Sequence, residues 1–374
     1  MSYLKPSNSS SANSGRFTED LRSMARVCRF FCSIASPWIF ESFCLVIGRD
    51  ETGTGPENRT KFCRRLNGEE AAQTVARFVK KCTVSLLRRC NSTRWALQEL
   101  LSMHSKAIAH MPNIEEIVLE LVIIKKDTLK SLARLERLKT LRIMFCNLSQ
   151  DVKEKHLVKI STLRLSSLNI SFLPSAALVT DESNPNIVSF LNQINWSCII
   201  KFTATTIPTT IQSAWMSLKG IPLVELDLFR IEMASLLRLL EKTPSLRHLR
   251  VVEVSSPQHT PPDSSAAPLL EEIEAPLPVC MMLVPGRPVA NLSLRNVGLQ
   301  GALLGPTEAN IFQSASCHIS QLRVPLEFYL NAPFWRHFPS LLFLRLDSPE
   351  RSVSIEQASR SSFLRRSLSQ IPFL

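Results

Sequence analysis

The chain has little glycine and no long apolar run. Only 10 of its 374 residues are glycine, which is few for a barrel built from tight turns. No stretch of about 18 uncharged apolar residues occurs, so the sequence predicts no membrane span. The first 20 residues are polar and lack the apolar centre of a signal peptide. We therefore expect an intracellular protein, cytoplasmic or nuclear, with no membrane partner.

Signatures of catalysis and of metal binding are also missing. The 10 cysteines include no CxxC pair, which favours reduced cysteines used as small core residues. The 7 histidines show no spacing typical of metal ligands. The chain has no glycine-rich phosphate loop and no GxSxG motif. We therefore expect a protein that is not an enzyme and that uses no cofactor and no metal.

The sequence does contain an apolar pattern that recurs along most of its length. The pattern is apolar-x-x-apolar-x-apolar, and five of the nine spacings between successive copies are 22 to 24 residues. This is the period of leucine-rich repeats. The ten copies begin at Val79, Ile114, Leu138, Ile160, Leu223, Leu246, Leu270, Val289, Ile319 and Leu341.

Each copy reads as a short strand whose apolar side chains face a common core, because side chains alternate along a strand. One unit cannot bury that face alone, so neighbouring units must stack. The pattern predicts an α/β leucine-rich-repeat solenoid, a curved parallel sheet with helices on its convex side, in which Leu249 and Leu344 are buried. The register is weakest between 166 and 222, where a degenerate strand near Ile199–Thr203 would divide the gap.

Composition divides the chain into four parts. Residues 1–15 are polar and serine-rich, and we expect them to be disordered. Residues 16–47 carry apolar residues at helical spacing. Residues 48–350 hold the irregular repeats, and residues 351–374 form a basic C-terminal tail.

The helical segment resembles the second half of an F-box. The family pattern there is roughly L-x-x-V-C-[RK]-x-[FW]-x-x-[IL]-A, followed by S-P-x-[LI]-[FW]. Residues 21–40 match it at Val27, Cys28, Arg29, Phe31, Ile34, Ala35, Pro37, Ile39 and Phe40. The Leu-Pro helix that opens an F-box has no counterpart in residues 1–20. Together with the repeats, the segment is similar to the fungal family of F-box and leucine-rich-repeat proteins.

This resemblance implies a substrate-recognition subunit of a cullin-type ubiquitin ligase, whose partial F-box binds the adaptor subunit. The residues expected to contact the adaptor are Val27, Phe31, Ile34, Pro37, Trp38 and Phe40. The same segment would also serve as a cap on the first strand, since repeat arrays must hide their terminal apolar face. A repeat scaffold with no link to a ligase is the alternative function.

A second pattern lies within the strands. The residue between the last two apolar positions of each copy points away from the core, and in five of ten copies it is arginine. These are Arg142, Arg164, Arg250, Arg323 and Arg345. They would form a stripe that binds an acidic or phosphorylated segment of a target protein, because the planar fork of arginine suits carboxylates and phosphates. Asp227 and Glu274 interrupt the stripe, and a solvated positive face is the plainer interpretation.

The net charge of +12 is unevenly distributed. Between Arg59 and Arg94, ten lysines and arginines stand against Glu69 and Glu70, a net of +8. Nucleic acid or an acidic protein face would suit such a segment. Only 2 tyrosines occur and aromatic residues do not alternate with basic ones, so nucleic acid is the less favoured partner.

Overall fold

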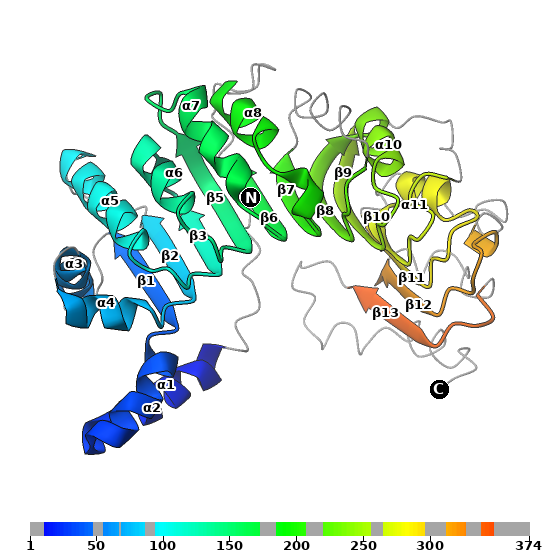
Figure 1. Ribbon diagram of the computed structural model, residues 1–374. Helices are drawn as coiled ribbons and strands as arrows, with labels where there is room; N and C mark the ends of the chain where they lie inside the picture. Colours follow the sequence, from blue (N-terminus) through cyan, green and yellow to red (C-terminus); the bar gives the residue numbers. More distant parts are fainter. Residues whose placement is uncertain are drawn as a thin grey trace. The chain divides into compact units, whose positions relative to one another are not determined.

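The computed structural model describes residues 11–47, 55–66, 69–86, 94–172, 185–206, 220–255, 265–295, 312–326 and 338–347. The chain forms two compact units, unit 1 (Met1–Ile199) and unit 2 (Ile200–Leu374). Each unit contains a parallel β-sheet, and the helices that connect its strands lie on one face of that sheet (Figure 1).

Unit 1 begins with two helices, α1 (Ser11–Val27) and α2 (Arg29–Ile39), which pack against each other. Its strands follow the order β1-β2-β3-β5-β6, with β4 beside β5. They are β1 (Ser42–Ile47), β2 (Lys81–Leu86), β3 (Glu116–Glu120), β4 (Ile123–Ile124), β5 (Thr140–Leu148) and β6 (Ser167–Phe172). The other helices are α3 (Gly55–Arg65), α4 (Glu70–Ala76), α5 (Arg94–Ile108), α6 (Lys126–Leu132), α7 (Glu154–Leu157), η2 (Val158–Thr162), α8 (Pro185–Asn192) and η3 (Trp196–Cys198).

Unit 2 carries strands that pair in chain order, each parallel to the next. They are β7 (Lys201–Thr206), β8 (Glu225–Glu232), β9 (His248–Ser255), β10 (Glu272–Pro276), β11 (Asn291–Arg295), β12 (Gln321–Pro325) and β13 (Phe343–Asp347). Helix α10 (Met233–Glu241) follows β8, and α11 (Leu277–Leu283) follows β10.

The core consists of the apolar repeat positions stacked in register. Leu226, Leu249 and Ile273 face one another across β8, β9 and β10, and each is at most 1% exposed. Burying these side chains together removes apolar surface that no single strand could cover. The parallel strands, their buried apolar positions and the helices on one face confirm the predicted α/β leucine-rich-repeat solenoid.

The repeat around β5 follows the leucine-rich-repeat consensus most fully. Leu138, Leu141 and Ile143 are followed by Cys146 and Leu148, which matches the spacing L-x-x-L-x-L-x-x-[N/C]-x-L. The Cys146 thiol donates a hydrogen bond of 3.3 Å to the carbonyl of a residue in β3, one repeat earlier. Burial raises the pKa of this thiol to about 12, so it stays protonated and keeps its donor.

One predicted strand is out of register. Ile160, Leu163 and Leu165 are buried but lie in η2 and the loop after it, and the strand at this repeat is β6. The series Leu165, Leu168 and Ile170 has the same apolar spacing five residues later. The sequence is therefore compatible with two positions of the strand, and the structure adopts the later one. The degenerate strand near Ile199–Thr203 is confirmed as β7.

The ends of the described chain also differ from expectation. Helix α1 begins at Ser11, inside the segment expected to be disordered. Leu344 is only part-buried, whereas Leu249 is fully buried as predicted. The reason is position, because β13 is the last strand of the described sheet and pairs only with β12. No described helix has both the length and the apolar content that a membrane span requires.

We expect Leu249→Ala to destabilise the protein far more than Leu344→Ala. Removing a fully buried leucine side chain leaves a cavity and costs about 3 kcal/mol, whereas the same change at a part-buried end position costs about 1 kcal/mol. Urea unfolding of both variants, followed by circular dichroism, measures the two losses. Equal losses would show that the core extends beyond β13.

Helix α5 holds a buried histidine. The His104 side chain is 3% exposed, and neither ring nitrogen has a hydrogen-bond partner among the residues that the structure describes. Burial lowers its pKa to about 4 from the ordinary 6.5. The unfolded chain therefore binds a proton between these pH values that the folded chain does not, and stability falls as pH falls through this window.

We expect His104→Leu to flatten this pH dependence. The wild-type free energy of unfolding should drop by up to about 3 kcal/mol more than that of the variant between pH 7 and pH 4, since each pKa unit corresponds to about 1.4 kcal/mol. Urea unfolding across this pH range measures it. Parallel pH profiles for the two proteins would contradict a neutral, buried imidazole.

Candidate protein-interaction surfaces

The helices α1 and α2 expose large apolar side chains. Val27 is 72% exposed and Trp38 is 61% exposed. Phe31, Ile34 and Trp38 follow the spacing i, i+3, i+7, which places them on one face of α2. We call the exposed set the helix-pair patch, and it consists of Met24, Val27, Phe30, Phe31, Ile34 and Trp38.

The patch includes four of the six residues expected to contact an adaptor. The other two, Pro37 and Phe40, are half-buried at the end of α2. The structure adds Met24 from α1 and Phe30, whose ring packs edge-on against Phe31 at 5.7 Å between centroids. Sequence reasoning missed these two because Met24 replaces the leucine that opens the F-box pattern and Phe30 stands at a position that the pattern leaves unspecified.

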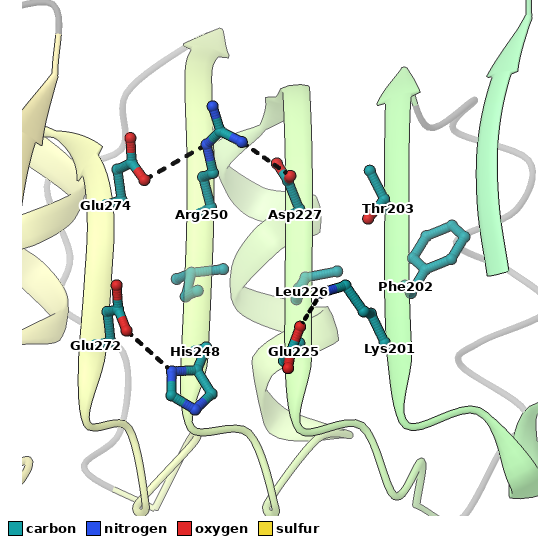
Figure 2. A pocket seen from close by; sticks show the side chains of 11 residues that line it. Lys201, Phe202, Thr203, Glu225, Leu226, Asp227, His248, Arg250, Glu272 and Glu274 are labelled. Carbon is teal, nitrogen blue, oxygen red and sulfur yellow. Dashed lines mark hydrogen bonds and ion pairs between the residues drawn. The ribbon is translucent and has the colours of Figure 1, made fainter. Parts of the chain in front are cut away.

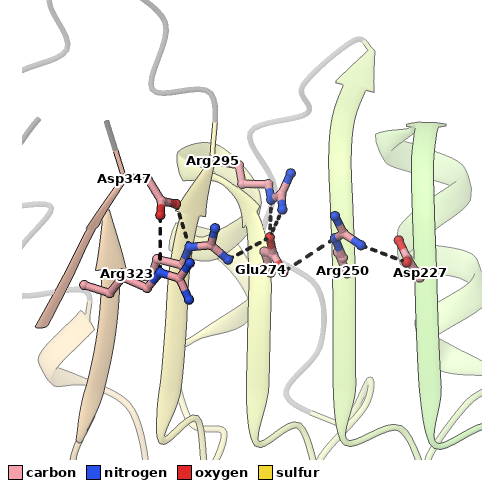
Figure 3. Close-up of polar contacts among 7 residues, drawn as sticks. Asp227, Arg250, Glu274, Arg295, Arg323 and Asp347 are labelled. Atoms are coloured by element: carbon pink, nitrogen blue, oxygen red, sulfur yellow. Dashed lines mark hydrogen bonds and ion pairs between the residues drawn. The ribbon is translucent and has the colours of Figure 1, made fainter. Parts of the chain in front are cut away.

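The second surface is the strand face of unit 2, on the side away from the helices. Asp227, Arg250 and Glu274 lie in register on β8, β9 and β10 and point out of the sheet (Figure 3). Arg250 reaches Asp227 at 3.1 Å and Glu274 at 3.5 Å. We call this connected set the charge ladder, and it consists of Asp227, Arg250, Glu274, Arg295, Arg323, Arg345 and Asp347.

The ladder continues across β11, β12 and β13. Arg323 Nε lies 2.5 Å from Asp347 Oδ2, and Arg345 Nε lies 3.5 Å from Asp347 Oδ1. Arg295 forms an ion pair with Glu274. Asp227 and Glu274 are thus ion-pair partners of the arginines. Sequence reasoning missed Arg295 and Asp347 because it considered only the outward residue between the last two apolar positions of each copy. Arg295 and Asp347 each come two residues after that position on their strands.

The structure brings together only part of the predicted arginine stripe. Arg323 and Arg345 lie side by side on β12 and β13, as the spacing suggested. Arg142 on β5 faces Asn169, and it pairs with Glu116 at 3.1 Å. The strand placement of Arg164 is wrong, because this exposed residue lies in the loop before β6.

A hollow of about 390 Å³ lies on the strand face over β7 to β10 (Figure 2). His248 Nδ1 lies 3.1 Å from Glu272 Oε2, and Lys201 pairs with Glu225. The charged lining comprises Lys201, Glu225, Asp227, His248, Arg250, Glu272 and Glu274. Four carboxylates against two permanent cations make this half of the face acidic, while the arginines gather toward β11 to β13.

The basic segment from Arg59 to Arg94 is partly neutralised. Arg65 pairs with Glu69 at 2.5 Å, and Lys80 pairs with Glu41 at 3.5 Å. The described part of the segment lies mainly on α3, α4, β2 and the first residue of α5, and residues 67, 68 and 87–93 fall outside the described residues. Its net charge is therefore distributed over several elements.

The buried cysteines carry protonated thiols. Burial raises the pKa of Cys63 to about 12, and it also raises the pKa of Cys82 and Cys280. A protonated thiol is a poor nucleophile and a poor metal ligand. Within the described ranges, no group of three or more His, Cys, Asp or Glu residues is arranged to hold a metal ion.

Comparisons with known proteins do not assign the chain to a family. No family model matches the chain, and no curated protein matches it. Among solved structures, the complex of Rad7 and Elc1 from yeast is 14% identical with a TM-score of 0.39, covering 92% of this chain and 87% of that one. An internalin from Listeria monocytogenes is 13% identical with a TM-score of 0.34, covering 80% of this chain and 92% of its own.

We expect the Asp227–Arg250 pair to couple only weakly. Their side chains are 33% and 41% exposed, and ion pairs of this exposure contribute about 0.5–1 kcal/mol, less at high salt. A double-mutant cycle with Asp227→Ala and Arg250→Ala, measured by urea unfolding at low and high salt, gives the coupling. A coupling above about 2 kcal/mol that salt does not change would contradict a solvent-screened pair.

Proposed function

We propose that the chain is a non-catalytic protein-interaction module that acts as the substrate-recognition subunit of a cullin-type ubiquitin ligase. The observation that carries this proposal is the helix-pair patch. Apolar surface of this kind costs free energy in water and marks a surface that a partner covers. In this proposal the helix pair binds the adaptor, and the strand face of the repeats binds the target.

The occupant proposed for the patch is the adaptor subunit of the ligase. Residues 21–40 match the second half of an F-box at nine positions, and four of the patch residues belong to the expected adaptor contact. Large aromatic side chains such as Trp38 provide much of the binding energy at protein interfaces. The repeats that follow offer a surface for a second protein, because their outward strand residues do not pack in the core.

The target proposed for the strand face is an acidic or phosphorylated protein segment. Arg250, Arg323 and Arg345 lie on the face of unit 2, and Arg142 lies on that of unit 1. Their guanidinium groups can bind carboxylates or phosphates in bidentate fashion. The acidic hollow over β7 to β10 directs such a target toward β11 to β13.

We expect the double change Phe31→Ala and Trp38→Ala to weaken adaptor binding by at least about 30-fold, since a single interface aromatic can contribute 2 kcal/mol or more and about 2 kcal/mol corresponds to about 30-fold. The measurement is calorimetric titration of the full chain with the purified adaptor. The control is Leu342→Ala with Phe343→Ala, which removes two exposed apolar side chains at the start of β13 and should change affinity less than twofold.

Two outcomes would contradict the proposal. If the full chain does not bind the adaptor, the protein is a repeat scaffold without a ligase link and the helix pair is its cap. If binding occurs but both double variants behave alike, the adaptor contacts another surface.

A further inference from the structure

Three arginines from three strands converge on one carboxylate of the charge ladder (Figure 3). Arg295 forms an ion pair with Glu274, Arg250 Nε lies 3.5 Å from Glu274 Oε2, and Arg323 Nη1 lies 3.8 Å from Glu274 Oε1. Guanidinium groups repel one another, so they gather in this way around an anion. Here the anion is a side chain of the protein itself.

The cluster is partly removed from water. The Glu274 side chain is 16% exposed, and those of Arg295 and Arg323 are 26% and 34% exposed. Charges interact more strongly in such an environment than on an open surface. The ladder contains four arginines and three carboxylates, so one positive charge is left unbalanced within it.

Glu274 does not satisfy all the donors around it. The Nε of Arg250 is buried and has no hydrogen-bond acceptor among the described residues, because its ion-pair distance to Glu274 is too long for a hydrogen bond. A buried donor without an acceptor costs free energy. A carboxylate offers two oxygens and one charge, whereas a phosphoryl group offers three oxygens and a charge of about −1.5 to −2.

We propose that Glu274 is the built-in occupant of an anion-binding site, and that a phosphorylated side chain of a partner protein displaces it. Arg250, Arg295 and Arg323 then hold the phosphoryl group. Exchange with a partner carboxylate gains little, because one carboxylate replaces another. Exchange with a phosphoryl group gains charge and a third oxygen, so Glu274 makes the face selective for phosphorylated partners. This inference rests on the proposed role of the strand face in target recognition and narrows it.

The test compares the full chain with Glu274→Gln, using inorganic phosphate as the probe in calorimetric titration. Removing the Glu274 carboxylate should raise phosphate affinity by about tenfold, because phosphate no longer has to displace this group from the three arginines. The matched control is Glu271→Gln, which changes the net charge equally but belongs to a separate pair with Arg247. It should change affinity less than twofold.

A second set of variants ties the gain to the cluster. Adding Arg295→Ala or Arg323→Ala to Glu274→Gln should return phosphate affinity to the wild-type value or below, while circular dichroism and thermal unfolding confirm that each protein is folded. Equal phosphate affinity of wild type and Glu274→Gln overturns the proposal. So does a gain in phosphate affinity that survives the loss of either arginine.

Two further probes identify the ligand's source. N-acetyl-phosphoserine amide should bind wild type at least as tightly as inorganic phosphate does, and N-acetyl-glutamate amide should bind much more weakly. Binding of inorganic phosphate alone, or equal binding of both amides, would overturn the assignment to a phosphorylated partner. These titrations contain no adaptor, so their failure leaves the ligase proposal standing, and the failure of adaptor binding leaves this site standing.

Discussion

The structure depends on the in-register stacking of apolar side chains from one repeat to the next. Leu226, Leu249 and Ile273 occupy equivalent places on successive parallel strands and are almost wholly buried. Each strand contributes half of a contact that only its neighbours complete, so the array is stable as a whole and weakest at its ends. The part-burial of Leu344 on β13 expresses the same rule.

Fixing the inward side chains also fixes the outward ones. Because side chains alternate along a strand, the register that stacks Leu249 on Ile273 places Arg250 beside Glu274. The helix pair of unit 1 works on another principle, since it presents apolar side chains to the outside. The chain therefore offers two kinds of surface, one apolar on helices and one charged on strands, which suit partners of different chemistry.

The repeat period and the alternation of strands were sufficient to predict the fold class and most buried positions. They failed where the pattern occurred twice, as at Leu163 and Leu168, because only packing decides between two equivalent frames. Site prediction went less far. Sequence reasoning treated Asp227 and Glu274 as interruptions, since which charges pair depends on rotamers and on neighbouring strands. It missed Arg295 because this residue is the last of β11, and where a strand ends depends on its pairing with the neighbouring strand.

Several ion pairs of the strand face join residues about one repeat apart, such as Arg250 with Asp227 and Arg323 with Asp347. The core is chemically repetitive, but this face is not. Deleting the repeat that contains β9 would stack Leu226 on Ile273 with no loss of apolar character, yet it would set Asp227 against Glu274, two like charges. The charges thus encode the order of the repeats. The repeats are interchangeable in their core residues but differ in their charged surface residues. This difference limits which repeats such an array can gain or lose.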